Sequence, residues 1–181
     1  TVLSAIETLV KCICTMHSAE MIHRDINPSN FGFIKRGNET LTQTLSMFDI
    51  NSICSVYGKN EDAVVTEGYQ EPEVRYEVAN NQTDIYSIGA TLFHAVIVTD
   101  EVKKNHYLYS GEYYDRLDEL VDQSRLIRAS EANSHPRLRS VIARILKKCL
   151  CERTYRYANC EELLDDLEIA LYYALPSEIA R

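Results

Sequence analysis

Two oxygen-bearing side chains, Asp25 and Asn30, lie five residues apart in the run from His23 to Asn30. Pro28 stands between them, and short apolar pieces precede and follow the run, which predicts a tight loop between two β segments. Such a loop could aim a carboxylate at an acceptor hydroxyl and an amide oxygen at a divalent metal. Alternatively, Asp25 ends a turn and Asn30 caps an element, because both side chain types commonly bond to nearby backbone groups.

A second carboxylate, Asp49, follows the second strand of a predicted hairpin. Residues 31–34 and 44–48 are mostly apolar and flank a polar, glycine-containing segment, which is the pattern of two paired strands. Pairing would bring Asp49 beside the loop that carries Asn30. Two oxygen ligands from different elements suit Mg²⁺, which keeps water and phosphate oxygens in its remaining positions.

Helical patterns account for most of the remaining chain. Apolar residues recur at helical spacing over residues 1–17, and residues 83–98 are apolar on several faces, which predicts a helix buried at the centre of the domain. The predicted elements of one domain over residues 1–181 are helices 1–17, 83–98, 113–124, 137–150 (entered through Pro136) and 160–174 (capped by Asn159), the hairpin 31–48, and the loops 23–30 and 49–73. The fold class is therefore mainly α, with a small antiparallel hairpin.

Composition narrows the classes of partner. The chain has 181 residues, 45% of them hydrophobic, and a formal net charge of −8, which argues against nucleic acid or an anionic membrane as the main partner. No apolar stretch is long enough to span a bilayer, so no membrane segment is predicted. The six cysteines include two Cys-x-Cys pairs, which fit zinc-site spacing poorly, so reduced thiols and a cytoplasmic location are expected.

The run His23-Arg24-Asp25, followed by Asn30, resembles the catalytic loop of the protein kinases. The resemblance continues in order along nearly the whole chain. The further matching segments are Asp49-Ile50-Asn51 in the place of Asp-Phe-Gly, Thr66 to Glu73 as the end of an activation segment with Glu71-Pro72-Glu73 for Ala-Pro-Glu, Asp84 to Gly89 as the start of the central helix, and Arg156. The resemblance implies the helical C-terminal lobe of a serine/threonine-kinase-like catalytic domain.

The resemblance implies catalytic roles for some of these residues. Asp25 would orient the acceptor hydroxyl and take its proton, an effect of about 10²- to 10⁴-fold for a positioned base. Asn30 and Asp49 would hold Mg²⁺ against the phosphates of ATP. Thr66 resembles the threonine that bridges to the catalytic aspartate in serine/threonine kinases, which favours a Ser or Thr hydroxyl of a protein substrate over tyrosine.

Other matching residues are expected to hold the site together rather than to react. The resemblance implies that His23 packs within the loop, that Asp84 anchors the loop backbone, and that Glu73 and Arg156 form a buried ion pair that would be costly to halve. Arg24 could pair with a phosphate on the activation segment, or it could bind loop carbonyls or a carboxylate.

The sequence departs from the kinase pattern at several positions. The Lys expected two residues after the catalytic Asp is Asn27, and losing a donor aimed at developing charge costs about 10²- to 10³-fold, although an amide can still donate. Ile50 and Asn51 replace the Phe and Gly after Asp49. No Gly-x-Gly-x-x-Gly loop or Val-Ala-x-Lys strand precedes the catalytic loop, so we expect the N-terminal lobe to lie upstream in a longer parent chain and this segment alone to be inactive.

The function expected from these observations is ATP- and Mg²⁺-dependent transfer of a phosphoryl group to Ser or Thr in a protein. One alternative is a pseudokinase-like scaffold or binding module, which Asn27, Ile50 and Asn51 favour. The other is a small-molecule phosphotransferase of the aminoglycoside or choline kinase type, which shares a His-x-Asp-x4-Asn loop. Arg24, the segment 71–73 and the helix at Asp84 argue against that second alternative.

Overall fold

The computed structural model describes residues 1–35, 43–56, 66–97, 110–124 and 137–175. The helices are α1 (Val2–Ser18), α2 (Asn81–Val96), α4 (Leu117–Gln123), α6 (Leu138–Leu150) and α7 (Cys160–Ala174). The strands are β1 (Met21–Ile22), β2 (Phe31–Lys35), β3 (Gln43–Met47) and β4 (Cys54–Ser55), and the 3-10 helices are η1 (Pro72–Arg75), η2 (Ser110–Arg116) and η3 (Arg153–Tyr155). The prediction of a mainly helical domain with a small antiparallel hairpin is confirmed.

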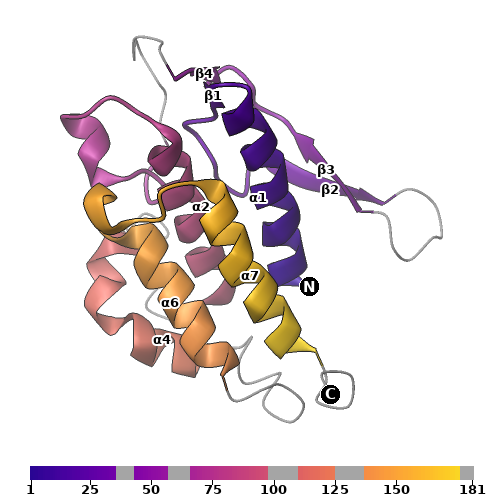
Figure 1. The fold of residues 1–181 in the computed structure, drawn as a ribbon, viewed down its shortest axis with the longest axis vertical. Coiled ribbons are helices and arrows are strands. Elements are labelled where there is room, and N and C mark those ends of the chain that lie inside the picture. The colour runs from indigo at the N-terminus through magenta and orange to yellow at the C-terminus, as the bar shows by residue number, and fades with distance from the viewer. Residues whose placement is uncertain (36–42, 57–65, 98–109, 125–136, 176–181) are drawn as a thin grey trace.

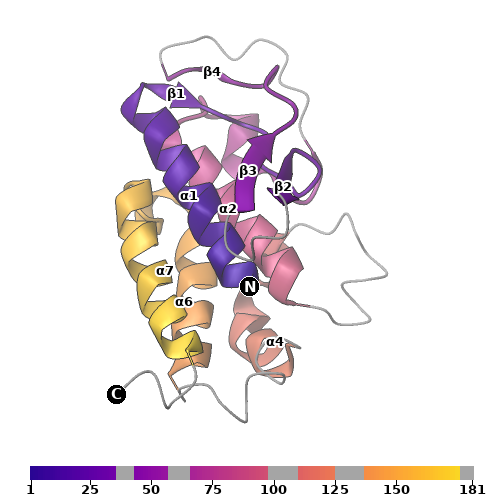
Figure 2. The ribbon, with the colours of Figure 1, turned by 90° about the vertical axis from the view of Figure 1, so that its right-hand side faces the viewer.

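The helices form one packed body around α2. Figures 1 and 2 show α1, α7 and α6 side by side, with the strand pairs beside α1 and with α4 beside α6. Helix α2 is buried without a break from Thr83 to Phe93, as its apolar pattern predicts. Gly89 permits a close approach to α6, because a Cβ atom there would lie only 2.2 Å from the Cβ of Cys149.

Helix termini follow local capping. The Asn80 side chain accepts a hydrogen bond from the Gln82 backbone N–H, and the Thr83 hydroxyl accepts one from the Asn80 backbone N–H. This cap starts α2 at Asn81, two residues before the predicted start. The Asn159 side chain accepts from the Glu162 backbone at 2.9 Å, so α7 begins where the sequence predicts.

Some predicted elements differ from the observed ones. The segment 113–124 is not one α-helix, because 3-10 geometry extends to Arg116 before α4 begins. The antiparallel pair β1–β4 and the short helices η1 and η3 were not predicted. The proposed helix start at Pro136 lies outside the described residues.

The hairpin β2–β3 pairs Phe31 with Met47 and Gly32 with Ser46. Alternate residues on the two strands, including Phe31, Leu45 and Met47, pack against the helical core. No helix in the described part of the chain is long and apolar enough to cross a membrane. All six cysteines are free thiols.

Candidate functional site

The loop that follows β1 is held in place by the buried carboxylate of Asp84, in the first turn of α2. Its two oxygens accept hydrogen bonds from the backbone N–H groups of His23 and Arg24, each at 2.8 Å. Arg24 has a φ of 67°, a region that side chains other than glycine rarely occupy. Its Nε also donates to the Ser52 carbonyl at 2.6 Å, so three hydrogen bonds fix this strained turn.

His17, at the end of α1, also donates to the Asp84 carboxylate, with Nε2 at 2.9 Å from Oδ2. Its other ring nitrogen lies 3.4 Å from the Cys160 thiol. The sequence analysis did not identify His17 as part of the site. A lone histidine in the last turn of a helix carries no spacing signal, and only the tertiary packing of α1 against α2 reveals its partner.

The Asp25 carboxylate is surrounded by neutral donors. Its Oδ1 accepts from the Asn27 amide at 3.0 Å and from the Thr66 backbone at 3.3 Å, and its Oδ2 accepts from the Asn30 amide at 2.7 Å. The Asn27 amide also donates to the Thr66 hydroxyl at 3.1 Å. The structure therefore brings together Asp25, Asn27, Asn30 and Thr66, although Thr66 lies far along the sequence.

Asn30 and Asp49, the two predicted oxygen ligands for a hard cation, lie on neighbouring segments. The Asn30 Nδ2 group donates to the Asp25 carbonyl and carboxylate, so the amide oxygen Oδ1 is the atom left for a metal. The Phe48 backbone donates to the Asn30 carbonyl at 3.0 Å, which brings the exposed Asp49 beside Asn30. Two such oxygens fit Mg²⁺, which takes its other ligands from water and phosphate.

His23 is fully buried and packs within the loop. Its ring lies 5.2 Å from the Phe31 ring, centroid to centroid. Burial lowers the pKa of His23 below its ordinary value, despite the nearby carboxylates. The ring is therefore neutral at neutral pH, and it contributes packing rather than charge to the site.

The end of the segment 66–73 is held by a buried ionic cluster centred on Glu71. Arg153 Nε donates to Glu71 Oε2 at 3.0 Å, Arg156 forms a second ion pair with the same carboxylate, and the Thr83 hydroxyl donates to it. The expected pair of Glu73 with Arg156 is present only as a longer contact of 3.4 Å. The predicted pair is therefore present and buried, and Glu71 is a further partner of Arg156 that was not predicted.

The pKa of Glu71 reflects two opposing effects in this cluster, burial and hydrogen bonding. Burial alone would raise the pKa, but hydrogen bonds from Arg153, Thr83 and Arg156 outweigh that effect and lower it. Arg153 was not identified from the sequence either. The sequence does contain a sign of this cluster, because Glu71 lies close to Glu73 and Arg153 lies close to Arg156.

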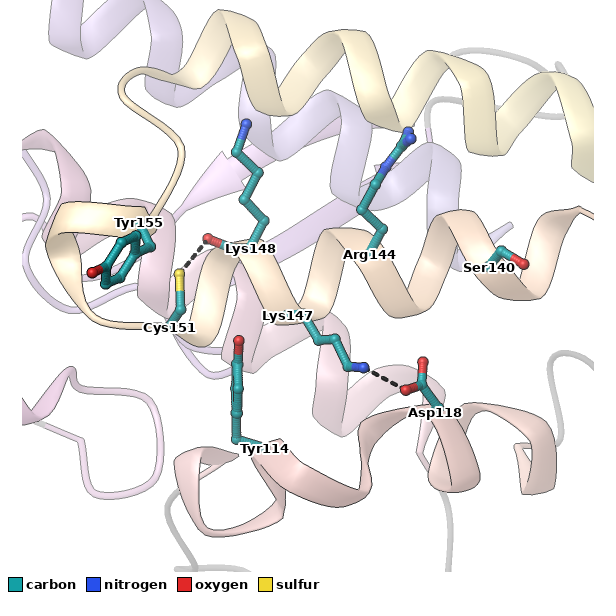
Figure 3. Close-up of a pocket in the computed structure, with 8 residues that line it drawn as sticks. All are labelled: Tyr114, Asp118, Ser140, Arg144, Lys147, Lys148, Cys151 and Tyr155. Atoms are coloured by element: carbon teal, nitrogen blue, oxygen red, sulfur yellow. Dashed lines mark hydrogen bonds and ion pairs between the residues drawn. The ribbon is translucent and has the colours of Figure 1, made fainter.

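A surface hollow lies apart from Asp25 and the residues that contact it. Figure 3 shows it over α4 and α6, with a volume of about 510 Å³. It is lined by Tyr114, Asp118, Ser140, Arg144, Lys147, Lys148, Cys151 and Tyr155. Its three cations are paired with Asp166, Asp118 and Glu162, respectively. Because these charges are already neutralised, the hollow offers no cluster of reactive groups comparable to that at Asp25.

Comparison with known proteins agrees with the geometry. The chain is 27% identical over 170 residues to serine/threonine-protein kinase B of Synechocystis sp. and 26% identical over 169 residues to the membrane-associated tyrosine- and threonine-specific cdc2-inhibitory kinase wee-1.3 of Caenorhabditis elegans. Each match covers 87% of this chain, but only 26% and 24%, respectively, of those relatives. Calcium-dependent protein kinase 3 of Plasmodium berghei is 24% identical over 144 residues, covering 67% of this chain and 26% of that protein.

The sequence profile of the protein kinase domain matches residues 1–167, which is most of the chain. The match includes the Asp25 loop, the hairpin, the Glu71 cluster and about half of α7. The chain therefore belongs to the protein kinase domain family.

Proposed function

We propose that the protein containing this chain transfers the γ-phosphoryl group of ATP to a Ser or Thr hydroxyl of a protein substrate, with Mg²⁺. The observation that carries the proposal is the arrangement at Asp25. One carboxylate is oriented by Asn27, Asn30 and Thr66. The segment that carries Asp49 is bonded to the backbone of Asn30, and these two residues would supply oxygen ligands for a cation. Membership of the protein kinase domain family and the distant serine/threonine kinase relatives support it.

Each of these residues has a defined task in the proposed reaction. Bound ATP supplies the transferable group, and Mg²⁺ neutralises its charge. Asp25 accepts the hydrogen bond of the acceptor hydroxyl and takes its proton as the oxygen becomes the nucleophile. Asn30 orients the Asp25 carboxylate through Nδ2, which leaves Oδ1 as the atom that would hold the metal. One side chain would then connect the base to the cation.

The substrate class follows from Thr66. The Thr66 backbone N–H donates to Asp25, and the Thr66 hydroxyl accepts from the Asn27 amide. These bonds hold Thr66 at the edge of the site, where an acceptor residue must pass. A short Ser or Thr side chain brings its hydroxyl to Asp25 only if the peptide backbone lies close to this edge. A tyrosine hydroxyl stands farther from its backbone and would need a deeper approach.

A phosphorylation assay on the full-length gene product tests the proposal. We expect transfer of labelled phosphate from ATP to a mixed protein substrate, dependent on Mg²⁺, with the label recovered as phosphoserine or phosphothreonine after acid hydrolysis. Label recovered mainly as phosphotyrosine would contradict the substrate class. Absence of transfer by a protein that still binds nucleotide would contradict the catalytic function and favour the scaffold.

The scaffold alternative has one observation in its favour. Every donor that contacts the Asp25 carboxylate in the described structure is neutral, because Asn27 stands where a lysine was expected. An active enzyme of this kind would stabilise charge on the transferring group without a cationic side chain at position 27. A kinase and a scaffold should therefore respond differently when a lysine is introduced at position 27.

Replacement of Asn27 by Lys separates them. If the protein is a kinase, we expect Asn27→Lys to raise kcat by roughly ten- to a hundredfold, since an ammonium group stabilises the developing charge better than an amide does. Steady-state kinetics of the two proteins measure this gain. Gln123→Lys adds the same charge on the exposed face of α4 and should leave kcat unchanged. A kcat that stays the same or falls would contradict the electrostatic argument.

A further inference from the structure

A second surface hollow lies next to the one over α4 and α6. The two hollows share Tyr114, Cys151 and Tyr155 as lining residues, which Figure 3 shows near the C-terminal end of α6. The second hollow has a volume of about 800 Å³, and its walls are η1, η2 and the turn that follows α6. None of the residues that contact the Asp25 carboxylate in the described structure lines it.

The two hollows carry opposite charge. Three cations and one acid line the first hollow. Among the described residues, three acids and one cation line the second, namely Glu73, Asp115, Glu152 and Arg75. Because opposite charges attract across an open surface, the second hollow favours a cationic group over an anionic one.

Glu73 belongs both to this hollow and to the buried ionic cluster centred on Glu71. The ion pairs of that cluster join three carboxylates to two guanidinium groups, namely Glu71, Glu73 and Glu77 to Arg153 and Arg156. Glu73 Oε1 accepts from the Arg153 backbone N–H at 3.1 Å, but Glu73 Oε2 is buried with no hydrogen-bond partner in the described part of the chain. Buried acceptors normally have a partner. These pairs therefore leave the cluster one cation short, and the carboxylate with the unpartnered oxygen lines the hollow.

Tyrosine rings line the same hollow as these carboxylates. Tyr76 and Tyr155 are 72% and 71% exposed, more than any other large exposed hydrophobic residue in the described structure, and Tyr114 is half-buried. The face of an aromatic ring attracts a cation. Tyrosine is also enriched where proteins bind one another. Rings that stand out from the surface, rather than closing over a small molecule, favour a side chain that another protein presents.

We propose that this hollow binds a lysine or arginine side chain of a partner protein, which the tyrosine rings and the carboxylates of Glu73 and Glu152 attract together. An anionic side chain would meet three carboxylates there. An apolar side chain would supply no donor for the unpartnered oxygen of Glu73. The hollow lies apart from Asp25, so this inference goes beyond the proposed phosphoryl transfer and does not depend on it.

The test measures dissociation constants by fluorescence anisotropy for the full-length gene product and two labelled peptides that contain no Ser, Thr or Tyr. One peptide alternates lysine with glycine, and the other has uncharged norleucine at every lysine position. We expect the lysine peptide to bind at least about tenfold more tightly than the norleucine peptide. The double variant Tyr76→Ala/Tyr155→Ala should weaken the lysine peptide by about five- to thirtyfold, the loss expected for two exposed cation–π contacts.

Two matched variants act as controls. Tyr76→Phe/Tyr155→Phe keeps both rings and should bind the lysine peptide as the wild type does. Tyr172→Ala removes an exposed ring from α7, outside the hollow, and should leave the affinity unchanged. Because all of these side chains are largely exposed, each variant should keep the wild-type Tm.

Three outcomes would overturn the inference. The first is a wild-type protein that does not prefer the lysine peptide to the norleucine peptide. The second is unchanged affinity in the double alanine variant, which would place the lysine peptide elsewhere on the protein. The third is free spermidine that binds as tightly as the lysine peptide, which would assign the hollow to a small organic cation instead of a protein. None of these measurements uses phosphoryl transfer, so the proposed function stands or falls separately.

Discussion

Replacement of Asp25 by Asn is expected to lower kcat for phosphoryl transfer by about 10²- to 10⁴-fold, because the amide cannot take the proton of the acceptor hydroxyl. The geometry makes this a specific loss. Asp25 Oδ1 accepts from two neutral donors and Oδ2 from Asn30, so an Asn side chain keeps one accepting oxygen but presents N–H donors to the Asn30 amide. Steady-state kinetics with the full-length gene product measure the change.

Two controls make the result interpretable. Asp165→Asn makes the same chemical change on the exposed face of α7 and should leave kcat within experimental error. The Tm of Asp25→Asn should stay close to that of the wild type, since Asp84 and not Asp25 anchors the loop backbone. A variant with more than a third of the wild-type kcat would contradict the assignment of Asp25 as the base.

Removal of the Glu71 carboxylate is expected to destabilise the fold by about 3–5 kcal/mol, the cost of breaking a buried ion pair from one side. Glu71→Ala leaves the buried guanidinium groups of Arg153 and Arg156 without their shared partner. Urea unfolding at neutral pH measures the free energy. We expect Glu73→Ala to cost less, because Glu73 lies farther from Arg156. A larger loss of unfolding free energy for Glu73→Ala than for Glu71→Ala would contradict this ranking.

Glu77 provides the matched control for this cluster. It pairs with the same Arg153 at 2.8 Å, but its side chain is 47% exposed. An exposed ion pair contributes about 0–1 kcal/mol, so Glu77→Ala should be nearly neutral. Equal losses of unfolding free energy for Glu71→Ala and Glu77→Ala would mean that burial does not determine the strength of these ion pairs.

The cluster also predicts how stability depends on pH. The pKa of Glu71 is lowered in the folded state from an ordinary value of 4.5, so its contribution is fully present above that value. The contribution disappears as the pH falls through the folded pKa, where the carboxylate is protonated. Unfolding free energies measured between pH 7 and pH 3 should therefore fall less steeply for Glu71→Gln than for the wild type.

Periodic patterns in the sequence predicted the long helices well, because a buried helix face leaves a regular trace. The ends of the helices were predicted less evenly. The start of α7 was predicted correctly because Asn159 is a recognisable N-cap, whereas no such residue marks the end of α2. The β segment predicted before the catalytic loop is β1, but its pairing with β4 was missed because two-residue strands are too short to show alternation. The change from a 3-10 helix to an α-helix within residues 113–124 was missed, because both kinds of helix bury similar faces of the segment.

The candidate site was predictable only where residues match a known motif. Asp25 and Asn30 are close in sequence, and Thr66 was predicted from its place in the motif, although no spacing rule describes the packing that joins it to Asp25. His17 and Arg153 match no motif position, so they were missed, and each acts on a partner in a different element. Glu71 was overlooked because the motif directs attention to Glu73, two residues later, and only burial reveals which carboxylate receives both arginines.

The Asp84 carboxylate has a consequence for how the loop moves. It joins the end of α1, the backbone of the loop and the most buried helix through hydrogen bonds to His17, His23 and Arg24. Loops usually open by local fluctuations that leave the core intact. Here the backbone before Asp25 opens only by breaking its bonds to the Asp84 carboxylate, so we expect the amide hydrogens of His23 and Arg24 to exchange with solvent more slowly than those of an unanchored loop.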